Sequence, residues 1–267
     1  MEQTLIAQVG ENTALESALK HDRWLTAGAV GLVALLCWAW IVPMARDMYG
    51  SMSGPAAWMM TDRWDVTHLA LLFAMWVVMM IGMMLPSAAP TLLLYATVLR
   101  KTAPAARVHA QVYSFAAGYL AIWSLFSLIA TVLQRLFSDM LLLSPMMELQ
   151  TRTGAGVLLM IAGAYQLTPL KRTCLDSCRG PVEFIMRHWQ SGKAGALRMG
   201  LTHGVHCLGC CWALMLLLFA GGIMNLWVIA ALTLFVLLEK LAPRGAQGGR
   251  LSGVLLIALG LWAAFLT

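Results

Sequence analysis

The chain has 267 residues, of which 60% are hydrophobic and only 11% are charged, and its mean hydropathy is +0.76. Soluble globular domains are about half apolar and about a quarter charged, and a soluble fold of this length exposes too much surface to hide such an apolar excess from water. The composition therefore excludes an ordinary soluble domain and predicts a protein embedded in a lipid bilayer.

Seven apolar runs follow one another along the chain and predict an all-α, polytopic bundle of transmembrane helices. They cover residues 24–42, 66–86, 112–133, 154–170, 203–220, 224–240 and 251–267. A helix needs roughly 17–25 apolar residues to cross a bilayer core of ~30 Å, and lipid offers no partner to an unpaired backbone group, so each run should be helical. The fourth and last runs are at the short end of this range, and six spans is therefore the alternative count.

The basic residues predict how the bundle is oriented. Of the 18 Lys and Arg residues, 14 lie in segments that share a side with the N-terminus. This bias predicts a cytoplasmic N-terminus and an exoplasmic C-terminus, and it explains the net charge of +6 through topology and anionic lipid, without nucleic acid. We expect residues 1–23 to form a cytoplasmic N-terminal tail and residues 24–267 to form a single transmembrane domain.

The first candidate ligands surround the predicted exoplasmic loop and the outer end of the second span. A possible uptake site for a metal comprises Met59, Met60, Asp65 and His68. Acidic residues are also favoured in the first turn of a helix, and a helix cap is the preferred interpretation of Asp65.

The second span carries a stripe of methionines, which ends at Pro86 and comprises Met75, Met79, Met80, Met83 and Met84. Thioethers are poor ligands for hard ions and for zinc, but they suit Cu(I). The stripe is therefore a possible metal pathway. The alternative is that these methionines are adaptable packing material in a helix interface.

Five of the six cysteines fall in two clusters at the predicted cytoplasmic face. The first follows the fourth span and contains Cys174 and Cys178; the second begins the fifth span and contains His203, His206, Cys207, Cys210 and Cys211. Cytoplasmic thiols stay reduced, so metal ligation or redox exchange is favoured over structural disulfides. Helical spacing places residues 203, 207 and 210 on one face, where the first cluster can complete a three- or four-ligand site. Glu239 and Lys240 end the sixth span on the same face as the cysteines. An interfacial ion pair is the preferred interpretation, and a role in the site is the alternative.

Three long motifs resemble the signatures of a known family, domain of unknown function 2182. They are residues 75–87, residues 165–171 with the following Cys174, Cys178, Arg179 and Pro181, and residues 207–212. They occur in the same order as in that family and cover the chain from about residue 66 to 243. The resemblance implies a multi-pass, metal-binding protein of the bacterial inner membrane, and it implies no particular activity.

The leading hypothesis is a protein that handles Cu(I), using the methionine-lined helix and the Cys/His site. It would take up or relay the ion, or insert it into a partner such as a metallochaperone or a metalloprotein. The chain has no Gly-x-x-x-x-Gly-Lys-Ser/Thr phosphate loop, so a nucleotide-driven pump is not expected, and catalysis of another kind stays open. Two alternatives remain: a membrane thiol–disulfide oxidoreductase using Cys207 with Cys210 and Cys174 with Cys178, and a structural subunit with a stabilising zinc site.

Overall fold

A computed structural model describes residues 2–50, 65–101, 104–144, 147–243 and 245–265; of residues 2–23, 105, 106 and 246 it describes the backbone alone. The fold class is all-α, as predicted. In chain order the helices are α1 (Glu2–Met48), α3 (Val66–Arg100), α4 (Ala105–Asp139), α5 (Arg152–Gln166), α6 (Pro169–Arg179), α7 (Pro181–His188), α8 (Gly192–Leu216), α9 (Leu218–Gly221), α10 (Leu226–Leu241) and α11 (Gly245–Phe265).

Five helical segments of the described chain are long and apolar enough to cross a membrane: Trp24–Met48, Val66–Arg100, Arg107–Asp139, Gly192–Gly221 and Gln247–Phe265. A sixth span is present if α5 and α6, which are bent by 66°, are counted together. The predicted count of seven is therefore corrected to five or six candidate spans, and the upper value of six equals the alternative count of the prediction. The reason is length, because α10 has 16 residues, or about 24 Å at 1.5 Å per residue, and falls short of a ~30 Å core.

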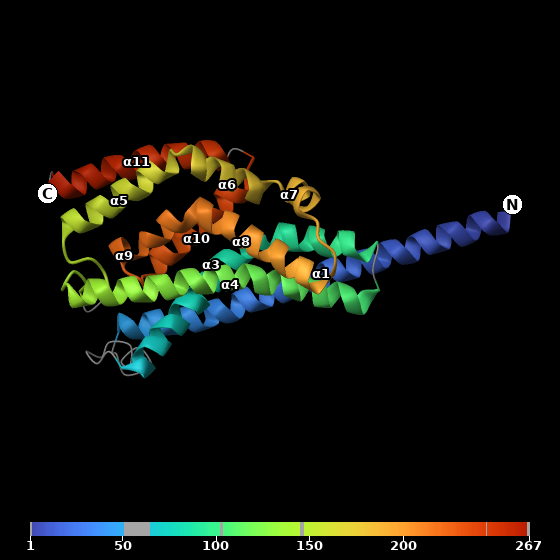
Figure 1. The fold of residues 1–267 in the computed structure, drawn as a ribbon, viewed down its shortest axis with the longest axis horizontal. Coiled ribbons are helices and arrows are strands. Elements are labelled where there is room, and N and C mark those ends of the chain that lie inside the picture. Colours follow the sequence, from blue (N-terminus) through green and yellow to red (C-terminus); the bar gives the residue numbers. More distant parts are fainter. Residues whose placement is uncertain (1, 51–64, 102–103, 145–146, 244, 266–267) are drawn as a thin grey trace.

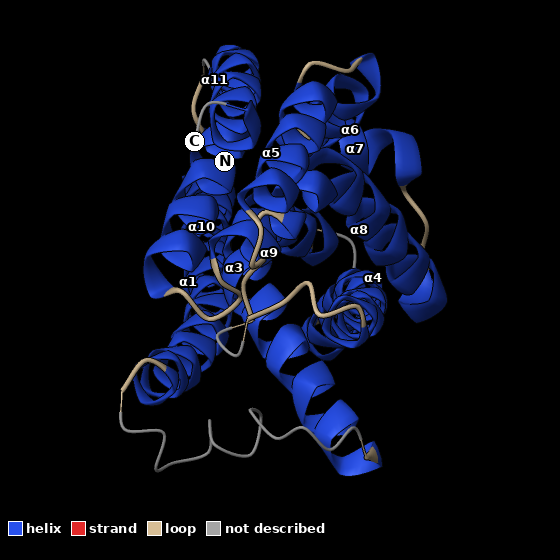
Figure 2. Ribbon diagram, turned by 90° about the vertical axis from the view of Figure 1, so that its left-hand side faces the viewer, coloured by secondary structure: helices blue, strands red, loops and turns tan. Residues whose placement is uncertain are grey.

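The long helices run along one common direction (Figures 1 and 2). α5 and α11 lie side by side along one edge of the bundle, α1, α3 and α4 lie along the opposite edge, and α8 and α10 lie between them. The two termini lie at opposite ends of the molecule. α7 lies toward the end from which α1 projects, and α9 lies toward the end that carries the C-terminus.

α3 continues to Arg100, well beyond the predicted end at residue 86, although it contains Pro86 and Pro90. Proline lacks a backbone N–H and normally breaks or kinks a helix, but in membrane helices neighbouring side chains take over part of the hydrogen bonding. Beside the prolines, Met84 O accepts hydrogen bonds from Ser87 Oγ (2.7 Å) and from Tyr119 Oη of α4 (2.9 Å). The proline segment of α3 is thereby tied to α4.

Glycines allow α4 and α8 to pack closely. Gly118 of α4 and Gly200 of α8 each lie so close to backbone atoms of the facing helix that no Cβ fits at either position. Small residues are what allow membrane helices to approach at backbone distance. This contact sets the spacing between Tyr119 on α4 and Cys207 on α8.

Candidate metal centre

The candidate centre is built around Cys207, a residue of α8 that is 1% exposed. Its Sγ lies 3.0 Å from the Oη of Tyr119 on α4 and 2.9 Å from the Nζ of Lys240 on α10. Lys240 Nζ also donates a hydrogen bond to Ser87 Oγ of α3, at 2.9 Å. Four helices thus converge around one sulfur atom, and one of them supplies a buried cation.

Three further thiols surround Cys207. Cys178 of α6 lies close to Cys207 and Cys210. The Sγ atoms of Cys210 and Cys211, one turn along α8, lie 3.1 and 2.9 Å from the carbonyl oxygen of Cys207. All four thiols are free and buried, and we call Cys178, Cys207, Cys210 and Cys211 the thiol cluster.

Cys174 lies at the edge of the thiol cluster and is half-buried. Its Sγ rests against Gly209, where a Cβ would come within 2.7 Å of that sulfur. Tyr165 Oη donates a hydrogen bond to the carbonyl oxygen of the same glycine. Gly209 thus gives α6 room to approach α8, so that the two cysteine motifs, which are about thirty residues apart in the chain, meet.

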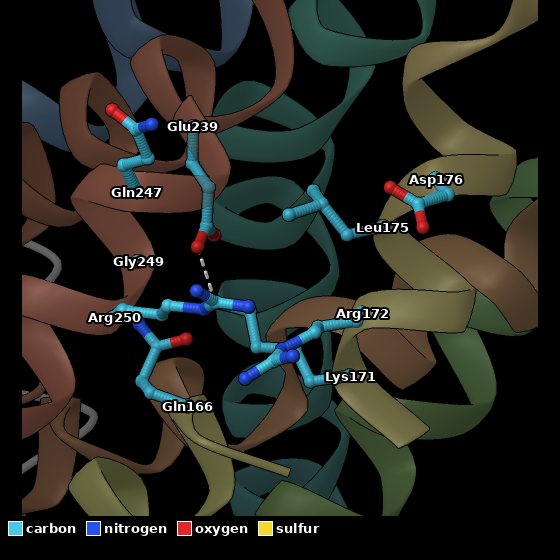
Figure 3. A pocket seen from close by; sticks show the side chains of 9 residues that line it. All are labelled: Gln166, Lys171, Arg172, Leu175, Asp176, Glu239, Gln247, Gly249 and Arg250. Carbon is cyan, nitrogen blue, oxygen red and sulfur yellow. Dashed lines mark hydrogen bonds and ion pairs between the residues drawn. The ribbon is translucent and has the colours of Figure 1, made fainter. Parts of the chain in front are cut away.

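A buried ion pair joins α6 to α10. Lys171 Nζ lies 2.5 Å from Glu239 Oε1, and the two side chains are 2% and 1% exposed. Figure 3 shows this pair at the wall of a pocket of about 260 Å³, with Arg172 and Arg250 nearby. The pair fixes the rotation of α10 about its axis, because Glu239 must face α6.

Arg179 provides a second link between the same two helices. It donates hydrogen bonds to the carbonyl oxygens of Glu239 (3.1 Å) and Ala242 (2.7 Å) at the C-terminal end of α10. These carbonyls have no partner within the helix, and a cation there also interacts favourably with the helix dipole. Cys178 directly precedes Arg179, and Lys240 directly follows Glu239, so both links bring those two side chains to Cys207.

Lys240 is a candidate site residue that the sequence analysis left out, because an interfacial ion pair between Glu239 and Lys240 was preferred over a role in the site. The structure corrects this: Glu239 pairs with Lys171, whereas Lys240 turns into the bundle and contacts Cys207. Consecutive helical residues point about 100° apart, so two neighbours do not face each other. That angle, together with the predicted position of Lys240 at the same membrane face as the cysteines, was the available signal.

The methionine stripe of α3 lies in the core of the bundle. Each of its five members is 0% exposed: Met75, Met79, Met80, Met83 and Met84. At one end of the stripe, Met84 Sδ lies 3.9 Å from Cys211 Sγ. The stripe and the thiol cluster therefore meet sulfur to sulfur.

The two histidines of the predicted site occupy different places. His203 is 2% exposed and packs among the rings of Phe115, Tyr119 and Phe184, at centroid distances of 5.9, 5.7 and 4.9 Å. His206 instead lines a cavity between α6, α7 and α8. The structure thus brings the cysteines together and places His206 to one side of them.

The predicted uptake site falls partly outside the described residues, because Met59 and Met60 lie in the segment 51–64. Asp65 is the N-cap of α3, and its Oδ1 accepts a hydrogen bond from the backbone N–H of His68 at 2.8 Å. This geometry is that of an ordinary helix cap. His68 itself is buried.

Among the described side chains, no three His, Cys, Asp or Glu residues are arranged as a preformed metal site. The thiols of the cluster are instead engaged with Cys207 O, with Tyr119 and with Lys240. Metal binding to thiols replaces such contacts and releases protons. A neighbouring ammonium group stabilises the thiolate form that a metal requires.

The sequence profile of one protein family matches residues 73–263, which is most of the chain; the family is PpoB2, described as copper chaperone. The matched range contains the thiol cluster, Lys240 and the methionine stripe. This description agrees with the metal-binding membrane family expected from the motifs, although the profile does not carry the name of domain of unknown function 2182. Comparisons with curated proteins and with solved structures find no match.

Proposed function

Because this chain belongs to the PpoB2 family of copper chaperones, we propose that it holds Cu(I) at the thiol cluster within the membrane and passes the ion to a partner protein. The observation that carries the proposal is the 2.9 Å contact between Cys207 Sγ and Lys240 Nζ in the middle of four buried thiols. Copper is the metal that the family implies, and a chaperone implies a protein that receives it.

The charges around Cys207 favour a monovalent ion. A buried charge is costly unless an opposite charge or hydrogen bonds compensate for it. Cu(I) held by two thiolates has a net charge of −1, which the ammonium group of Lys240 neutralises. Zn²⁺ with the same two thiolates would leave the buried site with an uncompensated positive charge. Thiolate ligands also match the softness of Cu(I).

The methionine stripe provides a route to the thiol cluster. Met84 Sδ and Cys211 Sγ are 3.9 Å apart, and the rest of the stripe lies in the core of the bundle, away from lipid. Soft donors in series would let the ion move without meeting bare hydrocarbon, where a charge is expensive. We propose that copper passes along this stripe between the exoplasmic side and the cluster.

The test is copper loading of the reduced, detergent-purified protein beside two variants. The first variant replaces the thiol cluster (C178S/C207S/C210S/C211S). The second, Cys37→Ser, is the matched control, because Cys37 is a half-buried cysteine of α1 that lies outside the cluster. We expect the parent and the control to bind about one Cu(I) per chain with sulfur ligands, as measured by elemental analysis and copper X-ray absorption, and the cluster variant to lose this sulfur-bound copper.

Two results would contradict the proposal. If the same cysteines retain zinc in preference to copper, the protein would instead be a structural subunit with a stabilising zinc site. A reversible disulfide between Cys207 and Cys210, without copper binding, would indicate the oxidoreductase.

A further inference from the structure

Two histidines outside the thiol cluster lie next to each other, His188 at the end of α7 and His206 on α8. Their ring centroids are 6.0 Å apart, and the ring planes are inclined by 66°. Two imidazoles bound on opposite sides of one ion, with bonds of about 2 Å, have centroids roughly 6 Å apart. The spacing of the two rings therefore fits a shared, two-coordinate ion.

The hydrogen bonds of the two rings determine which nitrogen atoms are available. His188 Nδ1 lies 3.0 Å from Phe184 O, and His206 Nδ1 lies 2.8 Å from Thr202 O. A carbonyl oxygen only accepts, so Nδ1 carries the hydrogen in both rings, and the free lone pair of the neutral imidazole is on Nε2. Metal-binding histidines commonly have this arrangement, with one ring nitrogen donating to a carbonyl or carboxylate and the other facing the metal.

Both rings line a cavity of about 430 Å³ between α6, α7 and α8. Asp176 and Glu183 also line it, and Glu183 is paired with Arg187 at 2.6 Å. The carboxylate of Asp176 gives the cavity an acidic group suited to a cation. The cavity lies toward the end of the bundle that we predict to be cytoplasmic.

A third histidine lies between this cavity and the thiol cluster. His203 precedes Cys207 by one helical turn on α8, and its buried Nδ1 has no hydrogen-bond partner among the described atoms. A buried polar atom without a partner is destabilising, and a transiently bound ion would give it one. The ring of Phe184 contacts both His203 and His188, with centroid distances of 4.9 and 4.7 Å.

We propose that His188 and His206 form a second Cu(I) site, distinct from the thiol cluster, where the protein exchanges copper with a soluble thiolate-based carrier. His203 is the relay between this site and Cys207. The inference rests on the proposed copper-handling function, and it adds a place where the ion enters or leaves the membrane-embedded part.

Exchange at this site is a ligand substitution without electron transfer. In the inward direction, the Cu–S bonds to the carrier break as Cu–Nε2 bonds form at His188 and His206, and the carrier leaves with its thiolates free. The Cu–N bonds then break as Cu–S bonds form in the thiol cluster, and the thiol that joins the Cys207 thiolate releases its proton to solvent. Copper remains Cu(I) throughout. The preference of Cu(I) for thiolate lets imidazoles hold the ion without trapping it.

The test uses the full-length protein in lipid nanodiscs and two independent readouts. In the first, a variant with Cys174 and the thiol cluster changed to Ser is loaded with Cu(I), and copper X-ray absorption is recorded. We expect a nitrogen component with imidazole scattering beside any thioether sulfur of the methionine stripe, and we expect adding H188Q/H206Q to weaken this nitrogen-bound copper at least about tenfold. The matched control adds His109→Gln, which changes an exposed histidine of α4.

The second readout keeps all cysteines and measures how fast Cu(I)–glutathione loads the thiol cluster. We expect H188Q/H206Q, and each single variant to a lesser degree, to slow loading about tenfold or more with the final sulfur-bound copper unchanged. Nitrogen-bound copper that survives H188Q/H206Q, or loading as fast as in H109Q, would overturn the second site. If the parent protein itself binds no copper through sulfur, that result would instead contradict the proposed function.

Discussion

At the scale of single residues, Glu239 and Lys240 are neighbours on α10 with different partners. Glu239 forms a buried ion pair with Lys171, and Lys240 contacts Cys207 and Ser87. The first residue holds α6 against α10, while the second supplies the positive charge of the candidate centre. Removing one member of the buried pair leaves an uncompensated charge, which costs far more than removing both.

We therefore expect Lys171→Met to lower the free energy of unfolding by about 3–5 kcal/mol, measured by thermal or denaturant unfolding in detergent. The double variant K171M/E239Q should recover more than half of that loss. Arg187→Met breaks the exposed pair of Arg187 with Glu183 and should cost less than about 0.5 kcal/mol. Equal losses in the single and double variants would show that the ion pair is not what holds α6 in place.

At the scale of helices, α5 and α11 pack through two glycine pairs. A Cβ at Gly156 would lie 2.7 Å from Gly260 O, and a Cβ at Gly163 would lie 2.7 Å from Gly253 O. Both helices space their glycines seven residues apart, so each pair recurs after two turns on the same face. This close contact supports α5, from which α6 continues with Cys174 and Cys178.

Gly163→Ala should therefore force the two helices apart and destabilise the bundle by about 1–3 kcal/mol. Gly28→Ala is the matched control, because Gly28 lies within the first span and a Cβ there meets nothing within 4 Å. It should leave stability unchanged or slightly raise it, since alanine favours a helix. Comparable melting temperatures for G163A and G28A would show that the α5–α11 contact tolerates a wider spacing.

At the scale of the whole molecule, the two termini lie at opposite ends of the bundle. Most of the basic residues lie in segments on the N-terminal side, which predicts that the end carrying α7 and the histidine pair is cytoplasmic. The proposed exchange site would then face soluble carriers, and the far end of the methionine stripe would face the exoplasmic side.

This orientation can be measured with single cysteines introduced at two exposed methionines. Met140, after α4, is 65% exposed, and Met186, on α7, is 77% exposed. In intact cells a membrane-impermeant maleimide should label Met140→Cys, and it should label Met186→Cys only after the membrane is permeabilised. The unsubstituted protein gives the background of the native thiols. The reverse pattern of labelling would invert the predicted topology.

The predicted site contained the cysteines and the methionines, because a soft-donor motif is local and can be recognised without knowing its surroundings. It did not contain Lys240 or His188. It also grouped His206 with the cysteines on helical spacing alone, whereas the structure turns that ring toward α7. Which side chain lies opposite a given cysteine depends on helices that are far apart in the chain.

The sequence by itself determined that the protein lies in a membrane, that it is helical and where its cysteines and methionines cluster, because hydropathy and helical spacing are properties of short segments. The tertiary structure decided how many helices are long enough to span, that α3 continues through its prolines, and which charges surround Cys207. The surroundings of Cys207 depend on close packing at Gly118, Gly200 and Gly209 and on the Lys171–Glu239 pair. Such contacts between distant segments leave no periodic signal in a single sequence.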